Sequence, residues 1–138
     1  MPGELFVDTS AWYPAVVRSH PDHRPIAAEL TGAVKRGTRI VTTNLVIAET
    51  HALLLRRVGR DVALAFARTV RHQPNLVISS DPALETQAIE DWLERYVDQD
   101  FSFTDAVSFT VMGSRDIGEA LTLDHHFTVA GFHVIPAP

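Results

Sequence analysis

Four carboxylates of this 138-residue chain stand where metal chemistry would need them. Asp8 and Asp124 each follow a short apolar run that predicts a buried strand. Glu49 and Asp105 lie near the starts of two mostly apolar helices, where an acid generally needs a partner or an ion. Carboxylate oxygens are hard ligands that suit Mg²⁺ or Mn²⁺, and such ions activate water and stabilise charge on a phosphoryl group.

Three of these acids also have ordinary structural explanations. Asp8 is placed to cap a helix, Asp105 carries a charge that a helix N-terminus favours, and Asp124 suits a turn after a strand. Glu49 has a weaker explanation of this kind, because a solvated helix face would be more polar than Leu45–Glu49. What favours one shared metal site is the joint placement of two strand ends and two helix starts.

The elements that must position these acids alternate along the chain. Apolar runs predict five strands, at Leu5–Val7, Arg39–Val41, Leu76–Ile78, Ala120–Leu123 and His133–Ile135. Helices are predicted from about residue 11, over 26–35, 45–58, 61–72 and 82–96, and from Ser102 to about 114. Strands separated by helices imply an α/β fold with a mainly parallel sheet, and the active crevice of such a sheet lies beyond the carboxyl ends of its strands. The mutual direction of the last two strands stays open.

Capping residues mark several helix ends. Thr9 or Ser10 is placed to cap the first helix, and Gly37 to end the second. Ser102 and Asp105 have the spacing of a capping box.

Composition excludes several classes of protein. The chain has no cysteine, which removes thiol nucleophiles, thiolate zinc sites and a secreted disulfide framework. No apolar run approaches the ~20 residues that cross a bilayer, and the acidic start is not a signal peptide, so we expect a cytoplasmic protein. The net charge of −5 falls to −1 without the four candidate acids, and therefore does not decide for or against nucleic acid.

The four acids lie in short segments, Phe6–Ser10, Ile47–Glu49, Phe101–Ala106 and Leu121–Phe127, the last followed by Ala130–Phe132 and a final strand. In this order and at these spacings the segments resemble the motifs of the PIN-domain nucleases, and within that family the VapC-type toxins of toxin–antitoxin pairs. The resemblance covers nearly the whole chain. It implies one PIN-like three-layer domain over residues 1–138, with the five-stranded sheet flanked by helices.

The same resemblance implies a metal-dependent endoribonuclease that is the toxin of a toxin–antitoxin pair. Its partners would be an RNA substrate, a small antitoxin protein that inhibits it, and a second copy in a homodimer. Asp8 and Asp105 would hold the main Mg²⁺ or Mn²⁺ ion. Glu49 and Asp124 would complete its shell through waters or hold a second ion.

Neighbouring polar side chains have alternative roles. Thr9, Ser10 or Thr104 would orient the metal ligands, although helix capping explains the same hydroxyls. His125 and His126 adjoin Asp124, and at most one of two adjacent side chains would face the site. Five arginines on two successive helices form either a solvated face or an edge that binds phosphate or a partner: Arg56, Arg57, Arg60, Arg68 and Arg71.

Competing functions are separated by single residues or by experiment. A phosphate-signalling receiver needs a lysine near a late strand, and the only lysine is Lys35. Haloacid-dehalogenase-like phosphatases need a second acid two residues after the nucleophile, where this chain has Ser10. A housekeeping PIN nuclease of RNA processing and a non-catalytic, metal-stabilised binding module remain as alternatives.

Overall fold

Five short strands form one sheet in the computed structural model, which describes residues 3–138. They are β1 (Glu4–Val7), β2 (Arg39–Thr43), β3 (Asn75–Ile78), β4 (Glu119–Leu121) and β5 (His133–Ile135). Their order is β3-β2-β1-β4-β5, and every neighbouring pair is parallel. The predicted five-stranded sheet is confirmed, and its last two strands run in the same direction.

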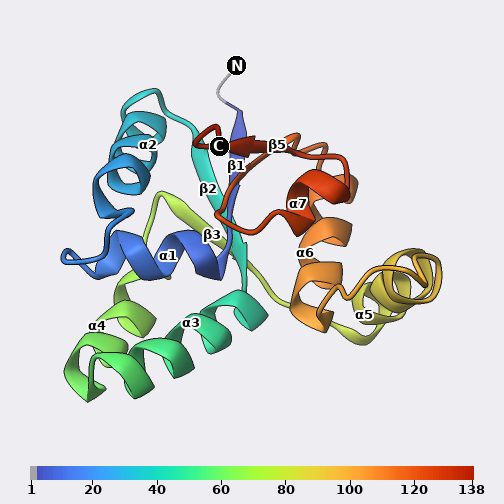
Figure 1. Ribbon diagram of the computed structural model, residues 1–138, viewed down its shortest axis with the longest axis horizontal. Helices are drawn as coiled ribbons and strands as arrows, with labels where there is room; N and C mark the ends of the chain where they lie inside the picture. The colour runs from blue at the N-terminus through green and yellow to red at the C-terminus, as the bar shows by residue number, and fades with distance from the viewer. Residues whose placement is uncertain (1–2) are drawn as a thin grey trace.

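Helices connect the strands and cover both faces of the sheet. The first half of the chain contributes α1 (Thr9–Val16), α2 (His23–Lys35), α3 (Asn44–Arg57) and α4 (Arg60–Thr69). The second half contributes α5 (Pro82–Ala88), the π-helix η1 (Ile89–Glu94), α6 (Phe103–Ser114) and α7 (His126–Val129). Figure 1 shows α1 to α4 on one side of the sheet and α5 to α7 on the other, which confirms the three-layer α/β fold. Within residues 3–138, none of the helices is long and apolar enough to cross a membrane.

The central strand β1 is held by apolar packing on both sides. Phe6 and Val7 are fully buried. The Phe6 ring lies 6.2 Å from that of Phe127 on α7, which packs at 4.9 Å edge-on against Phe109 of α6. Such packing is close and resists small displacements. The end of β1, where Asp8 follows, is therefore fixed in position.

The strand order creates one place where a crevice is expected. The chain passes outward from β1 to β2 and β3, then returns to place β4 on the other side of β1. The connections on the two sides of β1 therefore lead away in opposite directions, and ligands of open α/β sheets bind at such switch points, beyond the carboxyl ends of the strands. Asp8 follows β1 directly, at this point.

Several local predictions need correction. The N-cap of α1 is Asp8, whose side chain accepts from the Ser10 amide, so the capping role considered for Asp8 is confirmed and that considered for Thr9 or Ser10 is wrong. Because an Asp directly after the strand already supplies the capping oxygen, the helix begins two residues earlier than predicted. The capping box of Ser102 and Asp105 is confirmed. Gly37 follows α2 with φ of 78°, which is consistent with the predicted stop.

Two further differences lie in the second half of the chain. Strand β4 ends at Leu121, so Asp124 lies in a loop three residues later and does not follow the strand directly. The short helix α7 was not predicted, because its four residues are too few to show a helical period. The helix predicted to reach residue 96 changes to a π-helix at Ile89.

Candidate active site

Asp8 is the deepest of the four candidate acids. It is 4% exposed, and its Oδ2 accepts hydrogen bonds from the Ser10 hydroxyl at 2.9 Å, the Ser10 amide at 3.3 Å and the Thr122 hydroxyl at 3.1 Å. Burial raises the pKa of Asp8 to about 6, with a further contribution from the charge of Asp105, while the bonds from Ser10 oppose the rise. The structure therefore holds a carboxylate where its charge is poorly solvated.

Two hydroxyl groups join the end of β1 to the loop after β4. The hydroxyls of Ser10 and Thr122 lie 3.0 Å apart. The Leu123 amide donates to Ser10 Oγ at 2.8 Å, and the Asp124 amide donates to Thr122 Oγ1 at 2.9 Å. Sequence reasoning gave Ser10 a supporting role but missed Thr122, since nothing in the spacing of one buried threonine sets it apart. This network positions Asp8 and the backbone of Asp124 together.

Asp105 faces the same place from the opposite helical layer. Its Oδ2 accepts from the Ser102 amide at 3.2 Å, and its own amide donates to Ser102 Oγ at 3.0 Å. Burial raises the pKa of Asp105 and the charge of Asp124 raises it further, whereas hydrogen bonds from Ser102 and His126 lower it. The charge of Asp105 raises the pKa of Asp8, and the charge of Asp124 raises the pKa of Asp105. The three carboxylates therefore form one electrostatic cluster.

His126 lies between two of these acids. Its Nδ1 is 3.5 Å from Asp105 Oδ2 and 3.6 Å from Asp124 Oδ1, and its amide donates to Asp124 Oδ1 at 2.9 Å. His126 is 21% exposed and His125 is 80% exposed, so one of the two adjacent histidines faces the cluster, as the sequence indicated. Asp124, His125 and His126 each offer one potential ligand atom, all within 4.8 Å of one another.

Glu49 stands apart from this cluster. It is exposed on the second turn of α3, and among residues 3–138 it forms no hydrogen bond or ion pair. The start of α3 is nevertheless tied to the start of α1, because the Thr9 hydroxyl donates to the Val46 carbonyl at 3.4 Å and the Thr50 hydroxyl donates to Thr9 Oγ1 at 3.2 Å. The structure thus brings three predicted acids together and leaves Glu49 without direct contact to them.

The donor set fits a hard divalent cation. Asp8, Asp105 and Asp124 each use one carboxylate oxygen in local hydrogen bonds, and among residues 3–138 no hydrogen bond reaches the other. Within the same residues no lysine or arginine pairs with these three acids, since the ion pairs of Arg39, Arg60 and Arg115 involve other carboxylates. Converging acids with free oxygens and no lysine or arginine partner are the arrangement that Mg²⁺ or Mn²⁺ would neutralise.

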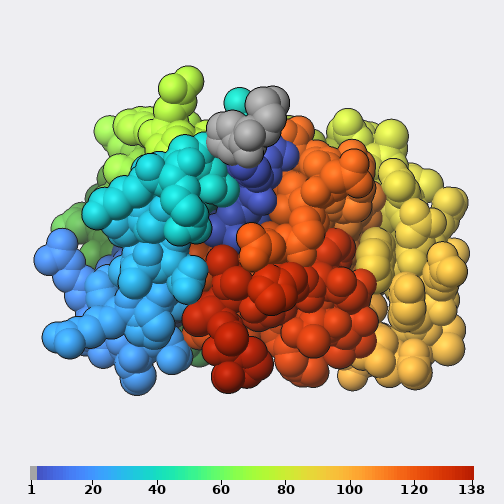
Figure 2. All heavy atoms as spheres, turned by 90° about the horizontal axis from the view of Figure 1, so that it is seen from above, coloured from blue at the N-terminus to red at the C-terminus, as the bar shows by residue number. Residues whose placement is uncertain are grey.

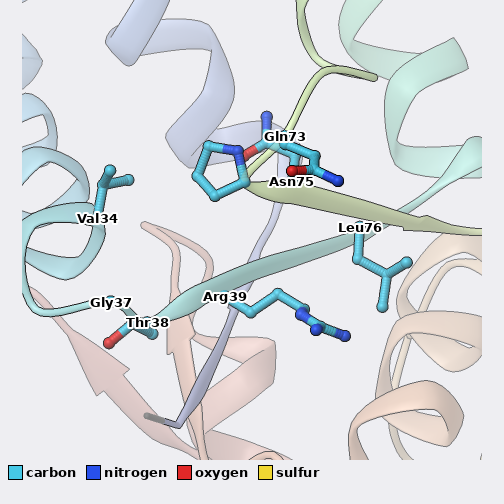
Figure 3. Close-up of a pocket in the computed structure, with 8 residues that line it drawn as sticks. Val34, Gly37, Thr38, Arg39, Gln73, Asn75 and Leu76 are labelled. Atoms are coloured by element: carbon cyan, nitrogen blue, oxygen red, sulfur yellow. The ribbon is translucent and has the colours of Figure 1, made fainter.

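Cavities do not compete with this assignment. A cavity of about 450 Å³ lies at the starts of β2 and β3, and Figure 3 shows Thr38, Arg39 and Asn75 among the residues that line it. This is the amino-terminal end of the parallel strands, whereas Asp8 follows the carboxyl end of β1, so the cavity lies away from the carboxylates. A smaller hollow of about 170 Å³ adjoins the cluster between Asp124 and the C-terminal Pro138.

Comparison with known proteins agrees with this geometry. Residues 5–132 match the model of the PIN domain. The chain is 39% identical over 129 residues to the 23S rRNA-specific endonuclease VapC20 of two strains of Mycobacterium tuberculosis, covering 93% of this chain and 95% of each relative. A crystal structure of M. tuberculosis VapC20, described as a Sarcin-Ricin loop cleaving toxin, superposes with a TM-score of 0.85 at 34% identity, covering 93% of this chain and 95% of that one. The chain therefore belongs to the PIN-domain family.

Proposed function

We propose that this protein is a metal-dependent endoribonuclease that hydrolyses RNA phosphodiester bonds as the toxin of a toxin–antitoxin pair. The observation that carries the proposal is the convergence of Asp8, Asp105 and Asp124 at the switch point of the sheet, where among residues 3–138 no lysine or arginine pairs with them. Membership of the PIN family and the names of the VapC20 relatives support it. The match to one family model over residues 5–132 supports a single domain over residues 1–138.

The four acids divide into two roles in this proposal. Asp8 and Asp105 would hold Mg²⁺ or Mn²⁺ directly, because they are the most buried and come from opposite sides of the sheet. Asp124 and the more distant Glu49 would complete the shell through waters or hold a second ion. When bound, the ion supplies a nucleophilic water near neutral pH and stabilises charge on the phosphoryl oxygens.

The remaining side chains position these ligands. Ser10 and Thr122 donate to Oδ2 of Asp8 and so leave Oδ1 for the site. Ser102 does the same for Asp105 through its amide. His126 lies within reach of both Asp105 and Asp124, and its Nδ1 orients the two carboxylates toward each other. Such supporting bonds fix ligand geometry before substrate arrives.

The names of the relatives suggest which RNA and which protein this chain binds. VapC20 is named as specific for 23S rRNA, and we propose the same class of substrate here. A small antitoxin would cover the carboxylates with a basic side chain, which a charged cluster of this kind would bind strongly. We further propose a homodimer and a cytoplasmic location.

The first test measures cleavage of 23S rRNA by purified protein. We expect cleavage in Mg²⁺ or Mn²⁺ and none in excess EDTA. Asp8→Asn and Asp105→Asn should each lower the rate by orders of magnitude, whereas Asp98→Asn, an exposed acid outside the cluster, should cleave like the wild type. Undiminished cleavage in EDTA would contradict the metal site, and metal binding without cleavage of any RNA would favour a non-catalytic binding module.

The second test separates a toxin from a housekeeping nuclease. Expression of the wild type without its genetic neighbours should arrest growth, and Asp105→Asn should relieve the arrest. Co-expression of a neighbouring small protein should restore growth and co-purify with the chain. Harmless expression of a wild type that cleaves RNA in vitro would favour the housekeeping function.

A further inference from the structure

Charge is strongly segregated along this chain. Residues 1–78 contain ten of the twelve basic residues and six acids, whereas residues 79–138 contain two basic residues and eleven acids. The net charge of −5 is thus the difference between a basic first part and a strongly acidic second part. An overall negative charge therefore does not describe the surface that a nucleic acid would meet.

The fold converts this segregation in sequence into segregation in space. Figure 2 shows the first part of the chain at one end of the molecule and the α5–η1 region at the other. The helices α1 to α4, which form one layer in Figure 1, carry six basic residues against three acids. The segment 79–100, which contains α5 and η1, carries seven acids against one arginine. The carboxylate cluster lies between the two, at the carboxyl ends of β1 and β4.

Helix α3 connects the cluster to the basic end. Its first turn is bonded to α1 through the Val46 carbonyl, next to Asp8. Glu49 lies in the next turn, and Arg56 follows two turns later on the same face, about 10 Å along the axis at 1.5 Å per residue. Arg57 packs over the Tyr13 ring at 5.8 Å. A face of α3 that is exposed at Glu49 and Arg56 and partly exposed between them therefore leads from the site to the start of α4.

The arginines at this end have few internal partners. Arg56 is exposed and, among residues 3–138, forms no ion pair. Arg60 opens α4 and lies 3.7 Å from Asp61, but both side chains are largely exposed, and a pair of this kind contributes little. Both guanidinium groups are therefore available to an external anion.

We propose that the exposed face of α3 and the α3–α4 turn, defined by Arg56 and Arg60, bind the phosphate backbone of single-stranded RNA that extends from the carboxylate site. The inference rests on the proposed nuclease function and adds the direction of the RNA across the molecule. RNA is favoured on this side by the arginines and repelled on the α5–η1 side by the seven acids. Exposed Leu55 and Val58 make a protein partner the competing occupant.

The test compares two double variants with the same change in charge. Arg56→Gln with Arg60→Gln alters the proposed surface. Lys35→Gln with Arg36→Gln alters exposed residues at the end of α2, beside the amino-terminal end of the strands and away from the carboxylates. Each is made in an Asp105→Asn background, and binding of a fluorescein-labelled single-stranded oligoribonucleotide is followed by anisotropy over a salt series.

The slope of log K against log salt is negative, and the loss of two phosphate contacts should reduce its magnitude by about 1.4, since each contact contributes ~0.7 for a single strand. Over the decade from 1 M to 0.1 M salt, this amounts to about 25-fold weaker binding at 0.1 M. The Lys35/Arg36 variant should keep the wild-type slope. In the active background, Arg56→Gln with Arg60→Gln should raise KM for RNA cleavage and leave kcat unchanged.

An unchanged slope, or an equal loss in both double variants, would overturn the inference while leaving the nuclease function intact. Unchanged RNA binding together with lost binding of a co-purified small protein would assign the surface to that protein and also overturn it. A wild type that cleaves no RNA would contradict the proposed function itself, whatever the arginine variants do.

Discussion

At the scale of single residues, Asp8 combines a structural task with a chemical one. It caps α1 and accepts from Thr122, yet its burial raises its pKa to about 6 from 3.8. A raised pKa means that the folded state binds this proton more tightly than the unfolded chain does. Burial therefore disfavours the charged form of Asp8, and a bound cation would favour it.

The stability of the metal-free protein should depend on the ionisation of Asp8. The raised pKa of Asp8 stabilises the folded state fully below pH ~4, and this stabilisation is lost as the pH rises through about 6. For a shift of roughly two pKa units, the loss is about 3 kcal/mol of unfolding free energy. Asp8→Asn cannot ionise, so its stability relative to wild type should rise by about that amount between pH 4 and pH 7. Urea unfolding of both proteins in EDTA measures the difference, and a difference independent of pH would contradict the burial of a charged Asp8.

Glu49 should behave differently, because it is exposed and has no partner among residues 3–138. Glu49→Gln should leave the metal-free melting temperature unchanged. If Glu49 reaches the ion through waters, the substitution should lower cleavage by about 10- to 100-fold, the usual effect of an outer ligand. Thermal unfolding in EDTA and initial cleavage rates test the two parts. Full activity of Glu49→Gln would remove Glu49 from the site.

Sequence reasoning reached the residue types of the site but not its supporting contacts. Asp8 and Asp105 were identified from their positions next to apolar segments, which local patterns reveal. The bond from Thr122 to Asp8 and the position of His126 between two acids join residues far apart in the chain. Such contacts depend on how β4 and α7 pack against β1 and α6, and no local pattern contains that information.

At the scale of elements, the capping box of α6 holds the side chain of Asp105 in position. Ser102 Oγ accepts from the Asp105 amide, and Asp105 Oδ2 accepts from the Ser102 amide. Ser102→Ala should lower the unfolding free energy by ~1 kcal/mol, as the loss of an N-cap usually does. It should also raise the Mg²⁺ or Mn²⁺ concentration needed for half-maximal cleavage, because the carboxylate is less well held.

A matched variant separates stability from the site. Asp81 caps α5 by accepting from the Leu84 amide at 2.8 Å, outside the cluster. Asp81→Ala should cost a similar free energy of unfolding and leave the metal dependence of cleavage unchanged. Chemical denaturation and metal titrations of the two variants make the comparison. An equal change in metal dependence would mean that Ser102 acts only through general stability.

Elements with strong local signals were predicted well, and those that depend on tertiary packing were not. The strand His133–Ile135 and the capping box at Ser102 agree with the structure, since apolar runs and capping spacings are local features. The end of β4 was placed too late because the apolar side chain of Leu123 continues the run, although it is 44% exposed after the strand ends. Its amide instead donates to Ser10 across the site.

At the scale of the whole molecule, two helical layers meet at the carboxylates from opposite sides. Asp8 follows the central strand and Asp105 belongs to the layer of α5 to α7. A cation bound between them would link the two layers and would bind the folded state only. The stability of the entire domain should therefore report on the site.

Removing the charge of Asp105 has two opposing effects on the metal-free protein. It loses the favourable interaction with the N-terminus of α6, about 0.3–1 kcal/mol, and it relieves repulsion among carboxylates, which reaches ~4 kcal/mol for charges about 4 Å apart at an effective dielectric near 20. Burial of the charge, which is the largest cause of the raised pKa of Asp105, and repulsion from Asp124 both favour a neutral side chain at this position. Asp105→Asn in EDTA should thus melt above the wild type.

Metal should reverse that order. At 100 times its Kd, an ion that binds only the folded state adds ~2.7 kcal/mol, which corresponds to about 8 °C in a domain of this size. The wild type should show this shift in Mg²⁺ or Mn²⁺, and Asp105→Asn should show a smaller one because a ligand is lost. Thermal unfolding of both proteins, each in EDTA and in metal, tests the prediction. If the variant melts clearly below the wild type in EDTA, or if metal leaves the wild type unmoved, the carboxylates do not form one metal site and Asp105 serves only as the capping charge of α6.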